Sequence, residues 1–190
     1  MEPTIKKITN KQLFSWKVFV FTVLTSFLCS PVSAQSANPI FAQLSSLTNQ
    51  IPESTGVYSV KIERIDDIQS LEMNDAKDQV IIKEPGAYFV MAAGQIGTTN
   101  ERQLLLGGFV DLWLTGNEKP VANSSTRGSI TISNKTIVLV TQGVLRLNAG
   151  DRVGSAFSVS DSSQGLGLIA TPGGKNEPAI PSIIFTIFKI

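Results

Sequence analysis

The sequence predicts an all-β fold, an antiparallel sandwich of two sheets with about eight to ten strands. Short runs of strand-favouring residues recur along the chain, and turn-forming residues separate them. No helical pattern interrupts these runs after Gln50. Because strands that alternate with helices would indicate a parallel sheet, the pattern favours strands that are joined directly by turns.

Residues 1–34 have the order of a secretory signal peptide. Lysines precede an apolar run from Val18 to Cys29, and the small residues Val32 and Ala34 fit a signal-peptidase site. The apolar run is shorter than the ~20 residues that a membrane-spanning helix needs, which makes an uncleaved anchor the weaker alternative. We expect cleavage after Ala34 and a secreted, extracellular or periplasmic protein without a stable membrane anchor.

Composition restricts the function of the mature chain. The sequence has no histidine, and its one cysteine lies in the predicted signal peptide, so the usual proton shuttle, a thiolate nucleophile and histidine-rich zinc sites are missing. The signal peptide holds four of the sixteen Lys and Arg residues and one of the fifteen Asp and Glu residues, which leaves a net charge of −2 and no basic stripe for nucleic acid. We expect a non-enzymatic protein without metal or cofactor and without a nucleic-acid partner. Paired carboxylates, as in glycoside hydrolases, are the remaining enzymatic alternative.

Residues 35–55 form a lead-in before a domain that is expected over residues 56–190. Asn38 and Pro39 fit a helix N-cap and first helical position, and apolar residues follow at helical spacing from Ile40 to Ile51. The pattern predicts a short helix of about three turns, which would be marginal alone. It would serve as an oligomerising segment or as a docked tail.

Turn-forming residues separate the strands of the domain. Residues 56–62 alternate and predict a first strand, and a Pro-Gly bend at 85–86 separates two further apolar runs. Gly116 and Asn117 can supply the positive φ values of a two-residue hairpin turn. The acidic residues over 66–78 lack the central Gly and closing Glu of a calcium loop, so we expect a solvated linker there.

The stretch from Ile137 to Val159 predicts two strands that fold back tightly on each other. Leu145 and Leu147 alternate with polar residues and should face the core, and residues 148–151 have turn chemistry. The closing run 183–188 is apolar on both faces, although a strand at a sandwich surface should have one wet face. We expect another subunit to cover its second face, and the alternative cover is the N-terminal helix of the same chain.

Four motifs in residues 79–190 resemble the C1q/TNF-like superfamily of complement-type heads and tumour-necrosis-factor cytokines. They are Pro85–Val90, Val110–Asn117, Leu145–Val153 and Ile184–Phe188. The resemblance implies a ten-stranded jelly roll, a homotrimer, and a recognition or adhesion role outside the cell. The complement-type Phe-Ser-Gly is replaced by residues 182–184, and no collagen-like stalk precedes the domain.

The closing strand and the aromatic residues of other strands provide the candidate site residues. The pattern of the closing strand places the subunit contact at Phe185, Ile187, Phe188 and Ile190. Trp113, Phe109 and Tyr58 are weaker candidates for a sugar-stacking surface, because aromatic residues on strands are more often core. The ligand is an unknown protein or glycan, and the alternatives are a structural component of an extracellular or cell-surface layer and a jelly-roll carbohydrate-binding protein.

We predict that the exported protein begins at Gln35, because the basic, apolar and small-residue segments occur in the order that signal peptidase recognises. N-terminal sequencing of the exported form measures this directly. Recovery of a species with intact Met1 in the membrane fraction would contradict it.

Overall fold

The computed structural model describes residues 38–99, 108–132 and 135–190, so the predicted signal peptide lies outside the described residues. The described residues form strands throughout, with one short 3₁₀ turn at Ser162–Gln164 and no α-helix. The strands are β1 (Phe41–Ser46), β2 (Tyr58–Ser59), β3 (Arg64–Gln69), β4 (Glu72–Met73), β5 (Gln79–Ile81), β6 (Gly86–Thr98), β7 (Phe109–Gly116), β8 (Lys119–Pro120), β9 (Thr126–Ser129), β10 (Ile137–Leu147), β11 (Arg152–Val159), β12 (Leu166–Leu168) and β13 (Ile183–Lys189).

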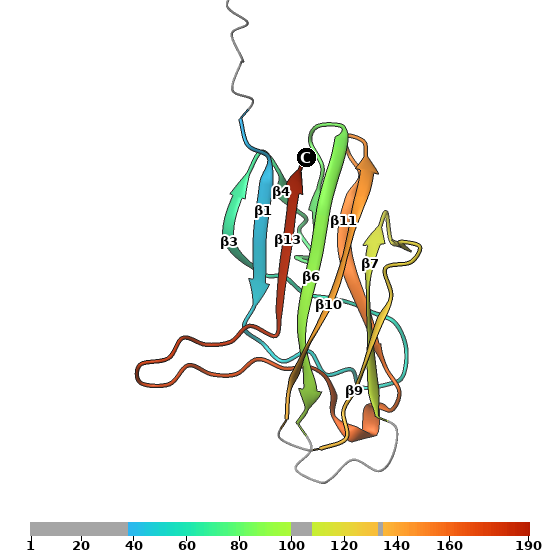
Figure 1. The fold of residues 1–190 in the computed structure, drawn as a ribbon, viewed down its shortest axis with the longest axis vertical. Coiled ribbons are helices and arrows are strands. Elements are labelled where there is room, and N and C mark those ends of the chain that lie inside the picture. The colour runs from blue at the N-terminus through green and yellow to red at the C-terminus, as the bar shows by residue number, and fades with distance from the viewer. Residues whose placement is uncertain (1–37, 100–107, 133–134) are drawn as a thin grey trace, which may run out of the picture. The chain divides into compact units, whose positions relative to one another are not determined.

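The strands pair in the nested order of a jelly roll. The first strand β1 pairs with the last strand β13, β5 pairs with β11, β6 with β10, and β7 with β9, all antiparallel. A six-stranded sheet has the order β10-β6-β13-β1-β3 (Figure 1), and β12 also pairs with β6. A seven-stranded sheet has the order β4-β5-β11-β7-β8, with β2 paired to β11 and β9 paired to β7. The predicted all-β sandwich of two antiparallel sheets is confirmed.

The core lies between the two sheets and is built from alternate residues of each long strand. On β6 and β13 the inward side chains are fully buried, as Val90 and Phe185 show. They pack in one cluster with inward residues of the other sheet, among them Leu112 and Val153. Tyr88 is also fully buried, and its hydroxyl donates a hydrogen bond of 2.7 Å to the Glu84 carbonyl oxygen. Because the buried hydroxyl has a hydrogen-bond partner, its desolvation costs little free energy, and the apolar area of the ring stabilises the core.

The predicted N-terminal helix is wrong, because residues 41–46 form strand β1. Ala42 and Leu44 are fully buried at a spacing of two residues, whereas Leu47, on the predicted helical stripe, is 40% exposed. β1 is hydrogen-bonded on both sides, to β13 and to β3. A helix of three turns is marginal by itself, so the two backbone ladders and the core contacts outweigh its local preference.

The predicted tight pairing of residues 137–147 with residues 152–159 is also wrong. The turn between them forms, with Gly150 at φ 91° and the Asp151 N–H bonded to the Asn148 carbonyl at 3.1 Å. It carries the chain from one sheet to the other, so β10 pairs with β6 and β11 pairs with β7. Leu145 and Leu147 pack against the core as predicted.

Three smaller predictions need correction. The acidic segment is not a linker but contains the edge strands β3 and β4, whose exposed charges suit a sheet edge. The turn between β7 and β8 centres on Asn117 and Glu118, at φ 49° and 67°, rather than on Gly116 and Asn117. The predicted first strand 56–62 is reduced to the two residues of β2.

We predict that Phe185→Ala lowers the free energy of unfolding by about 3–5 kcal/mol, because it leaves a cavity where a fully buried ring packs. Chemical denaturation of the predicted mature chain measures the change. Val57→Ala is the control, since Val57 is 71% exposed and its truncation should change stability by less than about 0.5 kcal/mol. Equal effects of the two substitutions would contradict the assignment of β13 to the core.

We predict that Asp151 makes the turn before β11 sensitive to acid. Hydrogen bonds from the Asn148 N–H and the Asn117 side-chain amide, at 2.7 and 3.0 Å, lower the pKa of Asp151. A carboxylate whose pKa is lowered on folding contributes stability above its unfolded pKa, about 3.9, and this contribution is lost as the pH falls through the folded pKa. Thermal melts of wild type and Asp151→Ala between about pH 7 and 2 should therefore converge at the acid end. A difference that stays constant with pH would contradict the role of the charge.

Candidate interface and binding cleft

The structure divides the four predicted interface residues between two environments. Phe185 and Ile187 are fully buried in the core of the subunit itself, so they are not available to a second subunit. Phe188 is 40% exposed and Ile190 is 64% exposed. The interface prediction is therefore corrected for the first pair and stays a prediction for the second pair.

The outward side of the six-stranded sheet carries a row of apolar residues across four neighbouring strands. The register places Val144 of β10 opposite Phe89 of β6, Phe89 opposite Phe188 of β13, and Phe188 opposite Phe41 of β1. The rings of Phe89 and Phe188 lie 5.2 Å apart between centroids. Figure 1 shows β1, β13, β6 and β10 side by side in this order. We call the outward residues Phe41, Phe89, Val138, Val140, Val144, Phe188 and Ile190 the apolar face.

One side of the apolar face is hollowed. A depression of about 500 Å³ lies over β1 and is lined by the rings of Phe41 and Phe188 and by Asp66 and Asp67 of β3. The opposite side of the face is formed by β10, which presents Val138, 64% exposed, at the free edge of the sheet. The two sides of this face therefore differ in shape and in charge.

The three aromatic candidates do not form one surface. Trp113 is only 8% exposed, and the guanidinium of Arg127 covers the ring of Phe109 at 3.7 Å. The same guanidinium pairs with both carboxylate oxygens of Asp111, at 2.7 and 2.8 Å, and this pairing raises the pKa of Arg127. Asp111 is therefore engaged in an ion pair and is not a free acid. Tyr58 lies on β2, which is separated from β7 by strand β11.

Tyr58 lines a cleft of about 480 Å³ between the segment that follows β1 and strand β2. Its ring packs against Phe157, with 6.0 Å between centroids, and Phe157 is only 2% exposed. The Tyr58 hydroxyl is 2.7 Å from the Ser54 hydroxyl and donates to the Ser54 carbonyl at 2.9 Å, which fixes the ring's orientation. The lining residues are Thr48, Asn49, Gln50, Ile51, Pro52, Glu53, Ser54, Tyr58, Ser59, Lys61 and Phe157.

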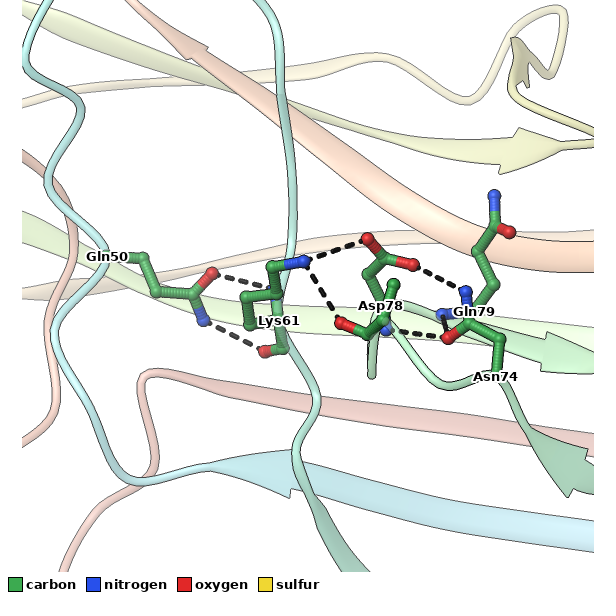
Figure 2. Close-up of polar contacts among 6 residues, drawn as sticks. Gln50, Lys61, Asn74, Asp78 and Gln79 are labelled. Atoms are coloured by element: carbon green, nitrogen blue, oxygen red, sulfur yellow. Dashed lines mark hydrogen bonds and ion pairs between the residues drawn. The ribbon is translucent and has the colours of Figure 1, made fainter.

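A clamp of hydrogen bonds joins the two walls of this cleft. The Gln50 side chain donates to the Lys61 carbonyl at 2.9 Å and accepts from the Lys61 N–H at 2.8 Å (Figure 2). The Lys61 ammonium in turn contacts the Asp78 carboxylate and the Ala76 carbonyl, each at 3.0 Å. The Asn74 amide supports the same Asp78 carboxylate at 2.8 Å, as Figure 2 also shows. The cleft is therefore preformed by the fold.

Two polar groups of the cleft have no internal partner. Within the part of the chain that the structure describes, neither the Glu53 carboxylate nor the Ser59 hydroxyl makes a hydrogen bond or ion pair. The Lys61 charge, by contrast, is already paired with Asp78. The open end of the cleft consequently carries an uncompensated negative charge.

Sequence reasoning found Tyr58 but missed the rest of the cleft. Gln50 and Lys61 lie eleven residues apart in irregular segments, and no periodic pattern or motif connects them. Gln50 also forms a backbone bridge to Leu168, which holds the 48–54 segment against β12. Long-range pairing therefore places these residues.

No group of three or more acidic, histidine or cysteine side chains in the described ranges is arranged to hold a metal ion. Among these same residues, no helix has the length and hydropathy required to cross a membrane. The sequence matches no protein-family model, and a search of curated proteins finds no match to it.

Proposed function

We propose that the mature protein is a secreted, non-enzymatic recognition or adhesion module, and that it works as a homotrimer whose subunits meet through the apolar face. The observation that carries this proposal is the row of apolar residues on the outward side of the six-stranded sheet. The resemblance of four motifs to the C1q/TNF-like superfamily supports the same stoichiometry and role.

Among the described residues, most of the apolar face is exposed: Val138, Val140, Val144, Phe188 and Ile190 are between 40% and 64% exposed. The outward side of an antiparallel sheet normally meets water and is polar. Here Val144, 60% exposed, and Phe188 stand on that side. The alternative cover, an N-terminal helix of the same chain, does not exist over residues 41–46, because β1 lies beside β13 as a neighbouring strand. A second copy of the chain is the cover that we propose.

A ring of subunits suits the two unlike sides of this face. In a closed cyclic assembly larger than a dimer, each subunit presents one surface to the next copy and a different surface to the previous copy. The hollow beside Asp66 and Asp67 and the projecting edge of β10 are two such surfaces. Arg146, which is exposed near the end of β10, carries the charge opposite to that of Asp67 in the hollow, whereas Asp66 is already paired with Arg64 at 2.8 Å.

Burial of the apolar face would favour assembly. Complete burial of a fully exposed Phe or Val side chain contributes about 1.5–3 kcal/mol, and Val144 and Phe188 retain 60% and 40% of their surface for such burial. Assembly through this face needs no disulfide, which agrees with a mature chain without cysteine.

Binding is favoured over catalysis by the chemistry of the available groups. The chain has no histidine, and the one acidic residue within the apolar strand β7, Asp111, is paired with Arg127. A structural role in an extracellular layer is the second candidate, because the same apolar face could build larger arrays. The size of the assembly separates the two: a discrete trimer favours recognition, and open-ended polymers favour a layer.

We predict that Phe188→Glu converts a trimer into monomers, because each interface would bury an unpaired carboxylate. Light scattering on the predicted mature chain at micromolar concentration measures the mass. Leu47→Glu is the matched control, since Leu47 has the same exposed fraction of 40% but does not belong to the apolar face. The control should remain trimeric.

Two results would contradict this proposal. A monomeric wild-type chain at micromolar concentration would reject the assembly and leave the jelly-roll fold intact. If the trimer persists in Phe188→Glu but dissociates in Leu47→Glu, the subunits do not meet through the apolar face.

A further inference from the structure

We infer that the cleft between residues 48–54 and β2 binds a saccharide. This inference rests on the proposed recognition function, for which it supplies a site and a ligand class. It does not depend on the oligomeric state, because no residue that lines the cleft belongs to the apolar face.

The dimensions and rigidity of the cleft suit a small ligand. Its volume of about 480 Å³ lies within the range of roughly 300–1,000 Å³ that is common for small-molecule sites. The Gln50 side chain, from one wall, bonds the backbone N–H and carbonyl of Lys61, in the other wall, at 2.8 and 2.9 Å. Because the walls are fixed before binding, the ligand does not have to order them, and more of the contact energy remains as affinity.

The lining combines an aromatic wall with free hydrogen-bonding groups. Phe157 forms an apolar floor, and the ring of Tyr58 is half-buried beside it and held by Ser54. At the rim, the Glu53 carboxylate can accept hydrogen bonds, and the Ser59 hydroxyl can donate and accept them. Both groups are exposed, so a purely apolar ligand would gain no hydrogen bonds from them. A saccharide presents C–H faces to the ring and hydroxyls to the rim, so it matches both parts.

The charge of the cleft narrows the class of saccharide. The Lys61 ammonium is held at 3.0 Å from the Asp78 carboxylate, so its charge is already compensated. Glu53 has no cationic partner in the part of the chain that the structure describes. A ligand carboxylate or sulfate would meet repulsion from Glu53, whereas hydroxyls or an amine would be attracted to it. We therefore expect neutral and amino sugars to bind and acidic sugars to be rejected.

In a trimer three such clefts would act together. Each cleft is lined by the 48–54 segment and β2, whereas the apolar face lies on the outward side of β10, β6, β13 and β1. A single open cleft gives weak binding, and three on one assembly raise the avidity for a polymer with repeated sugars. The preferred target is consequently a repetitive glycan rather than a single sugar.

The experiment titrates the ¹⁵N-labelled predicted mature protein with a neutral hexose oligomer, a hexosamine oligomer and a uronic-acid oligomer, at up to millimolar sugar. Chemical-shift changes should centre on Tyr58 and Ser59 for the first two probes and be absent for the third. Tyr58→Ala should weaken binding by at least about tenfold. Glu53→Gln should weaken it by about fivefold or more, because a neutral amide oxygen accepts a hydrogen bond less strongly than a carboxylate does. Glu118→Gln is the matched control, because Glu118 is an exposed acid in the β7–β8 turn, and it should change binding by less than about twofold.

Each outcome decides the inference. If Tyr58→Ala does not fold, Glu53→Gln alone carries the test, because Glu53 is exposed and forms no ion pair among the described residues. Absence of shifts with both neutral and amino sugars overturns the saccharide assignment, and so does binding that Glu53→Gln leaves unchanged. If the protein is a monomer that binds sugar, the trimer proposal is wrong and the saccharide inference stands. If it is a trimer that binds no sugar, the saccharide inference is wrong and the trimer proposal stands.

Discussion

The pairing of the last strand with the first is the interaction on which the rest of this structure depends. β13 lies between β6 and β1 and is hydrogen-bonded to both along its length. Its inward residues Ile183, Phe185 and Ile187 are fully buried and close the core. Because this pairing joins residues 41–46 to residues 183–188, the sheet is complete only when both ends of the domain are present. Such long-range closure makes folding slow relative to helical proteins of the same size.

This pairing also explains the exposed apolar surface. With β1 and β6 as sheet neighbours and the other sheet on its inner side, β13 has only its outward side left for further contacts. Phe188 on that side aligns with Phe41 and Phe89, so the register itself gathers aromatic residues from three strands. A strand that is apolar on both faces thus serves the core with one face and supplies the proposed contact between subunits with the other.

The cleft is built by a different kind of interaction. Lys61 follows β2 in an irregular segment where no sheet ladder satisfies its backbone groups, and the Gln50 side chain bonds both its N–H and its carbonyl. The ion pair of Lys61 with Asp78 and the amide of Asn74 extend this support to the segment before β5. The apolar face and the cleft are therefore separate surfaces, one suited to contact between copies of the chain and one suited to a small polar ligand.

The sequence by itself determined the strand character of the chain and much of the inward pattern. Alternation identified Leu145 and Leu147 as core-facing, and turn chemistry located residues 148–151. It did not determine which strands pair, because a period of two residues defines the faces of a strand but not its neighbours. For the same reason residues 137–159 were expected to form a hairpin, although β10 and β11 belong to different sheets.

Only the tertiary structure decided the remaining points. The spacing of Ile40, Phe41 and Leu44 fits a helix as well as a strand, and only the ladders to β13 and β3 decide for β1. Apolar residues on both faces of β13 do not show which face is internal, so Phe185 could not be distinguished from Phe188 before the second sheet was placed. The cleft left no signal in the sequence beyond Tyr58, because its floor and walls come from distant segments that only the folded backbone brings together.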